Sequence, residues 1–179
     1  MATTARSRLT LEEFLELPEQ EPGLEFDADG TIHEKMPPNT DHGALQAHLS
    51  YLLWAWIKAD PTQRAGYVYT ELRTNLAGAS KLPDVSLYRQ RPRASRRKHA
   101  LEAPDVAIEI VSPRDDMDDT RAKCPWYIEQ GSQLALLIDP EQRSVTRFDR
   151  QGQQELVSGP VSLLPGLELT VEGVFSVLD

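Results

Sequence analysis

The sequence has a single cysteine and no long apolar run. Cys124 stands alone among 179 residues, so no internal disulfide can form, and a disulfide-stabilised secreted domain is excluded. No window reaches the roughly 18 apolar residues of a membrane-spanning helix. The first 14 residues lack the apolar core of a signal peptide. We therefore expect them to belong to the mature protein, and we expect that protein to be cytoplasmic.

Positive charge is also scarce, and most of the chain is acidic. The chain has 19 Lys and Arg against 28 Asp and Glu, a formal net charge of −9. This balance excludes a protein whose surface as a whole binds nucleic acid without regard to sequence. Repeats and low-complexity tracts are absent too, and 40% apolar with 26% charged residues is ordinary globular composition. We expect one domain spanning residues 1–179.

One segment departs from this acidic average. Residues 89–99, which we call the basic loop, contain six cationic side chains and no acid: Arg89, Arg91, Arg93, Arg96, Arg97 and Lys98. Without these six, 13 basic residues face 28 acidic ones. Two interpretations remain open, a phosphate-contacting arm on an acidic body and a solvated loop with no partner.

Apolar periodicity and turn residues predict a mixed α/β architecture. Helices are predicted at 11–17, where Thr10 and Glu13 form a capping box, at 42–59, and over a third segment ending near Gly131. Strands are predicted at 24–27, 31–36, 66–72, 82–88, 105–111, 134–138, 144–148 and 155–157, with a turn at 77–80 and a short strand and turn at the C-terminal end. This order indicates a mixed central sheet flanked by helices, with extra N- and C-terminal hairpins.

Glu109 is the only acid in the apolar segment 106–111 of the predicted strand 105–111. A carboxylate buried in such a strand costs several kcal/mol, of order 2–7, unless it is paired. A buried salt bridge to a cation would satisfy it. A second explanation is a shared metal site with Asp84 on the preceding strand, because Mg²⁺ binds one or two carboxylates together with water and phosphate oxygens. We favour the metal site, with Mg²⁺ or Mn²⁺ as the ion.

Histidines offer weaker signals. His42 and His48 fall on the long predicted helix, with His42 in its first turn, where Thr40 or Asp41 is expected to cap the helix. A histidine there is either a helix-end residue or an accessory to catalysis, and we retain His42 as a possible accessory residue. His48 is interpreted as structural.

The arrangement of Pro83-Asp84, Glu109 and a nearby lysine resembles the PD-(D/E)XK nuclease superfamily. In most of that superfamily the lysine follows the acid by two residues, a position that Val111 takes here. The more specific similarity is to the Uma-type restriction endonuclease family, in which the lysine has moved to the following helix. The matching landmarks are EFLELP, GLEFDADG, Pro37 followed by His42, LPDVSLY, PDVAIEIVSP, Lys123 with Tyr127 and Gly131, LLIDP and PGLEL.

The resemblance implies a restriction-endonuclease-like core with Asp84 and Glu109 as metal ligands and Lys123 as the third catalytic residue. Pro125 is a departure, since proline is tolerated only in the first helical turn. It predicts a helix that begins at Ala122 or later and leaves Lys123 at the helix entrance. Lys81 and Arg121 are then the alternative cations.

Two hypotheses from different classes follow. The first is a Mg²⁺-dependent DNA endonuclease in which Asp84, Glu109 and the Ile110 carbonyl hold the metal and Lys123 orients the attacking water. The basic loop would follow DNA phosphates, and a homodimer would bring two sites to the duplex. The second is a catalytically degenerate nuclease fold that binds nucleic acid or protein. A hydrolase of small phosphoesters is a distant third, because the chain lacks a phosphate-cradling glycine loop.

Overall fold

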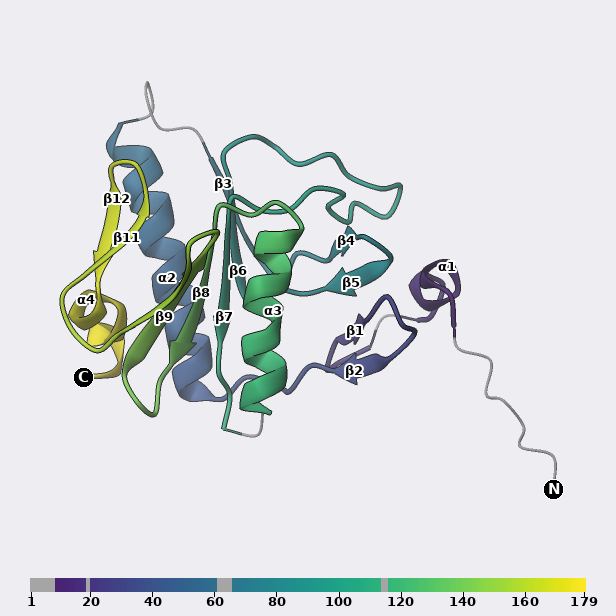
Figure 1. Ribbon diagram of the computed structural model, residues 1–179, viewed down its shortest axis with the longest axis horizontal. Coiled ribbons are helices and arrows are strands. Elements are labelled where there is room, and N and C mark those ends of the chain that lie inside the picture. The colour runs from purple at the N-terminus through teal and green to yellow at the C-terminus, as the bar shows by residue number, and fades with distance from the viewer. Residues whose placement is uncertain (1–8, 19, 61–65, 114–115) are drawn as a thin grey trace.

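A six-stranded mixed sheet forms the centre of the computed structural model, which describes residues 9–18, 20–60, 66–113 and 116–179 (Figure 1). The strand order is β10-β9-β8-β7-β6-β3. The bounds are β3 (Tyr67–Thr70), β6 (Val85–Tyr88), β7 (Val106–Ile110), β8 (Leu134–Asp139), β9 (Ser144–Asp149) and β10 (Gly152–Leu156). Only the β7–β8 pair is parallel among these strands. The predicted mixed sheet is therefore confirmed, whereas the first eight residues of the expected mature N-terminus lie outside the described ranges.

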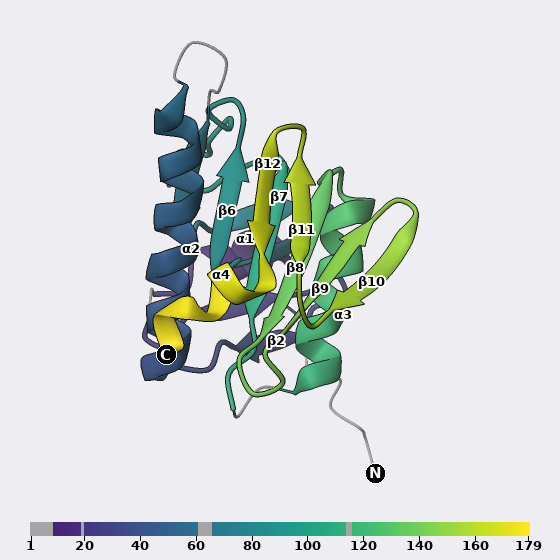
Figure 2. The ribbon, with the colours of Figure 1, turned by 90° about the vertical axis from the view of Figure 1, so that its left-hand side faces the viewer.

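Helices cover both faces of this sheet. One face carries α2 (Thr40–Ala59), the hairpin of β11 (Pro160–Leu164) and β12 (Leu167–Thr170), α4 (Val171–Phe175) and the 3₁₀ helix η1 (Ser176–Leu178). Figure 2 shows α2, α4 and this hairpin in front of the sheet. The other face carries α3 (Met117–Glu129). No helix within the described ranges is long and apolar enough to cross a membrane.

Side-chain alternation along β7 explains how an acid enters an apolar strand. Val106, Ile108 and Ile110 join the core beneath α2, while Ala107 joins the smaller core beneath α3. Because successive strand residues point to opposite faces, Glu109 shares the α3 face with Ala107. The strand buries apolar surface on one side and presents its carboxylate to a helix on the other.

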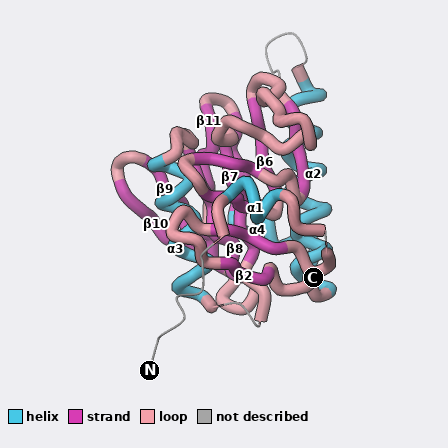
Figure 3. The backbone as a smooth tube through the Cα atoms, turned by 90° about the vertical axis from the view of Figure 1, so that its right-hand side faces the viewer, coloured by secondary structure: helices cyan, strands magenta, loops and turns pink. Residues whose placement is uncertain are grey.

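A second, smaller sheet packs beside the first and carries the N-terminal part of the chain. Its order is β2-β1-β5-β4, with β1 (Leu24–Phe26), β2 (Ile32–Glu34), β4 (Thr74–Leu76) and β5 (Ala79–Lys81). We call β1 and β2 the N-terminal hairpin. Figure 3 views the molecule from this side, with the short helix α1 (Leu11–Leu15) in front. The predicted turn at 77–80 is too long, because only Ala77 and Gly78 turn and Ala79 already begins β5.

Local signals at the helix starts are partly confirmed. Thr10 and Glu13 form the predicted capping box of α1. The cap of α2 is Asn39, whose side chain accepts from the His42 backbone N–H, so the helix begins at Thr40 rather than after it. His48 contacts the Gly173 carbonyl at 2.9 Å and so joins α2 to α4, in keeping with a structural role.

The predicted start of the third helix is wrong. Pro125 is the ninth of 13 residues in α3, which begins at Met117 with Asp116 as its cap. A proline inside a helix costs about 3 kcal/mol because it lacks an N–H and crowds the carbonyl four residues earlier. Asp116 caps the helix, and burial of Thr120, Cys124 and Tyr127 holds it against the sheet. Tertiary packing of the apolar face therefore outweighs the local cost.

Candidate active site

Two buried carboxylates lie beside each other at one end of the central sheet. Asp84 immediately precedes β6, and the register Val85↔Ile108 places it next to the end of β7. Its Oδ2 accepts a 2.6 Å hydrogen bond from the Ile110 N–H. Asp84 and Glu109 are each only 1% exposed, and both line the same cleft. The structure thus brings together the two acids that the sequence predicts as partners.

Lys123 reaches this pair from the middle of α3. Its Nζ lies 3.4 Å from Glu109 Oε2 and 2.9 Å from Glu25 Oε2. Both distances are within ion-pair range, so Lys123 lies beside Glu109 and Glu25. Because α3 begins at Met117, Lys123 lies inside the helix and not at its entrance, where Pro125 had predicted it.

Glu109 is held at both oxygens. The Tyr127 hydroxyl donates to its Oε1 at 2.8 Å, and Lys123 lies beside its Oε2. Burial, together with the negative charges of Asp84 and Glu25, raises the pKa of Glu109 to about 7, although Lys123 and Lys35 act to lower it. Of the two acids, Glu109 is the one whose pKa is raised, chiefly because it is buried.

Asp84 has the opposite electrostatic environment. Lys35 Nζ lies 2.7 Å and His42 Nε2 3.2 Å from its Oδ1. Burial alone would raise the pKa of Asp84, but Lys35 and His42 outweigh it and hold that pKa below its usual range. Hydrogen bonding to Asp84 likewise raises the pKa of His42 despite its burial.

Lys35 follows the N-terminal hairpin and makes three close contacts. Besides Asp84, it donates to Glu71 Oε2 at 2.6 Å and to the Leu82 carbonyl at 2.8 Å. Gln46 of α2 donates to the other Glu71 oxygen and to the Asp84 carbonyl. Four separate segments of the chain therefore fix the position of Asp84.

The cleft around these residues has a volume of about 300 Å³. Its lining residues come from the N-terminal hairpin, from α3 and from the ends of β6 and β7. Carboxylates and lysines dominate the lining: Glu25, Asp27, Glu34, Lys35, Lys81, Asp84, Glu109, Asp116, Asp119 and Lys123. Such a polar, cation-containing cleft suits a charged ligand better than an apolar one.

The two acids fit a hard divalent cation. Carboxylate oxygens are the ligands that Mg²⁺ uses, and Asp84 and Glu109 are two buried carboxylates that line the same cleft. In the part of the chain that the structure describes, no group of three His, Cys, Asp or Glu side chains could hold a metal ion. Two carboxylates completed by water match the usual Mg²⁺ site. Ile110 also lines the cleft, so its carbonyl stays a candidate ligand.

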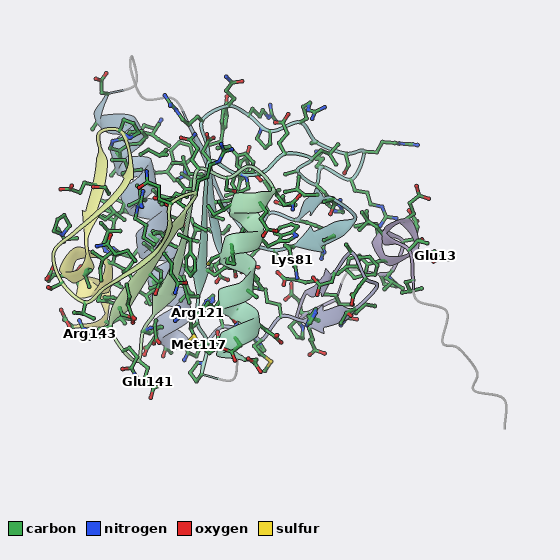
Figure 4. All side chains as sticks on the ribbon, in the orientation of Figure 1. Glu13, Lys81, Met117, Arg121, Glu141 and Arg143 are labelled. Atoms are coloured by element: carbon green, nitrogen blue, oxygen red, sulfur yellow. The ribbon has the colours of Figure 1, made fainter. Side chains whose placement is uncertain are left out.

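The alternative cations occupy different places. Lys81 is buried, and its Nζ lies 2.6 Å from Asp27 and 3.8 Å from Glu25. Arg121 does not line the cleft. Figure 4 shows Lys81 and Arg121 on opposite sides of α3. Among these three cations, only Lys123 lies beside Glu109.

The basic loop joins the ends of β6 and β7 that lie away from Asp84 and Glu109. Two of its arginines are paired within the protein, Arg93 with Glu102 and Arg97 with Glu16 and the Leu15 carbonyl. None of its six cations lines the cleft. Arg97 lines a neighbouring groove of about 690 Å³ that shares Lys35, Met36 and His42 with the cleft.

Sequence reasoning missed the contribution of the N-terminal hairpin. Glu25, within β1, pairs with Lys123, and Lys35, just after β2, pairs with Asp84 and with Glu71, which follows β3. Glu25 and Tyr127 fall within the landmarks GLEFDADG and Lys123–Tyr127–Gly131, so a signal was present. Lys35 and Glu71 carry no local pattern, because only the docking of the second sheet brings them to Asp84.

Comparison with known proteins agrees with this geometry. A crystal structure described as a putative nuclease belonging to DUF820, from Anabaena variabilis, superposes with a TM-score of 0.85 and 28% sequence identity over 96% of this chain and 99% of that chain. No curated protein matches the sequence. The model of the Uma2 family, described as "Putative restriction endonuclease", matches residues 11–176. The chain belongs to the Uma2 family.

Proposed function

We propose that this protein is a Mg²⁺-dependent endonuclease that hydrolyses phosphodiester bonds in DNA. The observation that carries the proposal is the convergence of Asp84, Glu109 and Lys123 in one cleft, from two strands and a helix. Membership of a family described as restriction endonucleases supports nuclease chemistry, and so does the description of the Anabaena protein.

Asp84 and Glu109 would hold the metal, with the Ile110 carbonyl as a further ligand. When bound, Mg²⁺ supplies a Lewis acid that polarises the phosphodiester and lowers the pKa of bound water. The Ile110 N–H keeps Asp84 Oδ2 in place, while Tyr127 orients Glu109. These contacts preorganise the acids before substrate binds, which limits the reorganisation needed during reaction.

Lys123 would act on the attacking water and on the charge that develops at phosphorus. Its ammonium is a donor fixed beside Glu109 rather than a mobile surface charge, since its side chain is 16% exposed. Neighbouring Glu109 and Glu25 raise the pKa of Lys123 despite its burial, so it stays protonated at neutral pH. It therefore orients water and donates to a phosphate oxygen more readily than it removes a proton.

The proposal extends to the whole molecule. The basic loop follows the DNA backbone beyond the cleft, with Arg97 at the adjoining groove. A homodimer places two such clefts on the two strands of a duplex. A cytoplasmic location is part of the same proposal.

A nicking assay tests this function. Supercoiled plasmid is incubated with the protein and Mg²⁺, with Mn²⁺, or with EDTA, and the matched variants are Asp84→Asn and Glu109→Gln. We expect conversion to nicked or linear DNA only with wild type and a divalent ion. Binding of DNA without cleavage under every metal condition would instead favour the degenerate, binding-only alternative.

A further inference from the structure

Glu25 is a buried acid of the N-terminal hairpin with no assigned role in the proposed chemistry. It is 2% exposed and lies in β1, outside the central sheet. Its Oε2 lies 2.9 Å from Lys123 Nζ, which is closer than the 3.4 Å between Lys123 and Glu109. The nearest carboxylate to the candidate catalytic lysine therefore comes from a different sheet.

The second oxygen of Glu25 is anchored to the main chain. Glu25 Oε1 accepts a 2.8 Å hydrogen bond from the Leu82 N–H, two residues before Asp84. This contact fixes the carboxylate relative to the strand that presents Asp84. Glu25 thus links Lys123 of α3 to the backbone N–H of Leu82, close to Asp84.

Lys123 needs such a connection because its side chain is long. A lysine side chain loses on the order of 1.5–2 kcal/mol of rotamer entropy when it is fixed in one geometry. A lysine two residues after Glu109, directly after β7, would be held by the same stretch of backbone as that acid, but Val111 occupies this position. Lys123 comes instead from a helix, so another group has to define where its ammonium stands.

The neighbouring cation does not compete strongly for Glu25. Lys81 Nζ lies 3.8 Å from Glu25 Oε2 but 2.6 Å from Asp27 Oδ1. Asp27 also contacts His33 at 2.6 Å and does not contact Lys123. The hairpin therefore presents one acid to Lys123 and a separate acid to Lys81.

We propose that Glu25 is the positioning residue for Lys123, holding its ammonium beside Glu109 by a charge-assisted hydrogen bond. The N-terminal hairpin then contributes a positioning residue to the active site. This inference rests on the proposed nuclease function only for its kinetic consequences. The positioning itself is a property of the metal-free protein.

The first test needs no catalysis. NMR of the Lys123 ammonium, assigned with Lys123→Arg, follows hydrogen exchange at Nζ in the metal-free full-length protein. Because Glu25→Gln removes the charged acceptor but keeps an oxygen for Leu82, we expect exchange at Nζ to become about tenfold faster or more. The matched control is Asp27→Asn, which alters a hairpin acid that contacts Lys81 and should leave Lys123 exchange within about twofold of wild type. Unchanged exchange in Glu25→Gln would overturn the proposal.

The second test separates positioning from general stability. We expect Glu25→Gln to lower kcat about 10- to 100-fold with KM within about twofold, and to cause no further loss when Lys123 is already Ala. An equal loss in both backgrounds would show a structural role and refute positioning. Should Glu25→Gln fail to fold, Glu25→Asp, which keeps the charge but shortens the reach, replaces it in both measurements. If wild type cleaves no DNA, the nuclease proposal fails, while the exchange measurement still decides the role of Glu25.

Discussion

Lys123 Nζ lies 3.4 Å from Glu109 Oε2, although one residue comes from the middle of a helix and the other from a buried strand. The contact places a cation beside Glu109 where Val111, two residues along the strand, supplies none. It also determines which variants are informative, because Lys123 on α3 can be removed without altering β6 or β7, the strands that position the two acids.

We expect Lys123→Ala to reduce Mg²⁺-dependent cleavage by at least about 100-fold, since a positioned donor of this type contributes about 10²- to 10⁴-fold. Mg²⁺ affinity, measured by calorimetry, should persist because both carboxylates remain. Arg121→Ala is the matched control, since it removes a cation from the same helix on the other side. Cleavage by Lys123→Ala at the wild-type rate would make Lys81 or Arg121 the candidate.

Mg²⁺ binding should weaken at acidic pH because protonated Glu109 is a poor ligand. The pKa of Glu109 is raised from 4.5 to about 7. Affinity should therefore fall roughly tenfold between pH 8 and pH 6, and this fall should vanish in Glu109→Gln. Titration calorimetry at the two pH values measures it, and a flat wild-type profile would contradict the shift.

The raised pKa of Glu109 affects the stability of the metal-free protein in the opposite direction, so that stability falls as the pH rises. Because the folded pKa of Glu109 lies above the unfolded value, the folded state holds the proton more tightly. Its contribution to stability is fully present below about 4.5 and is lost as pH rises through about 7. Urea unfolding of wild type and Glu109→Gln should show the variant gaining on wild type between pH 5 and pH 8.

The basic loop should affect DNA binding through its exposed cations. Arg96 and Lys98 are exposed, whereas Arg97 is paired with Glu16. Reversing the charge of Arg96, Arg97 and Lys98 together should weaken DNA binding and flatten its salt dependence by roughly 0.9 per lost phosphate contact. Arg96→Glu with Lys98→Glu should account for most of this change. Binding measured by anisotropy across salt concentrations with an unaltered slope would identify a solvated loop.

Pro125→Ala should stabilise the protein, because it restores an N–H that can donate to the Arg121 carbonyl in the interior of α3. Pro125 is exposed, so no core packing is lost. A gain of about 1–3 kcal/mol is expected from the cost of proline in a helix interior. Denaturant unfolding measures the gain, and cleavage should be unaffected. A loss of stability would mean that α3 is adapted to its proline.

The sequence alone determined the pairing of Asp84 with Glu109. An isolated acid in the apolar strand 106–111 has few stable explanations, and the Pro-Asp before strand 82–88 supplies an acid on a neighbouring strand. Strands that follow each other in the sequence usually lie side by side in a sheet. The side chains of Asp84 and Glu109 could therefore be expected to meet. The capping box and the mixed sheet were predictable for the same reason, since each depends on nearby residues or on simple alternation.

Tertiary structure decided what surrounds that pair. Local rules placed the start of α3 at Ala122 or later, but burial of Cys124 and Tyr127 against the sheet outweighs the cost of Pro125, and the full helix brings Lys123 to Glu109. Glu25 reaches Lys123, and Lys35 reaches Asp84, only because the N-terminal hairpin pairs with β5 in a second sheet. Such contacts link residues 49 to 98 positions apart. They depend on how whole helices and sheets pack together, and local periodicity or spacing in the sequence does not predict that packing.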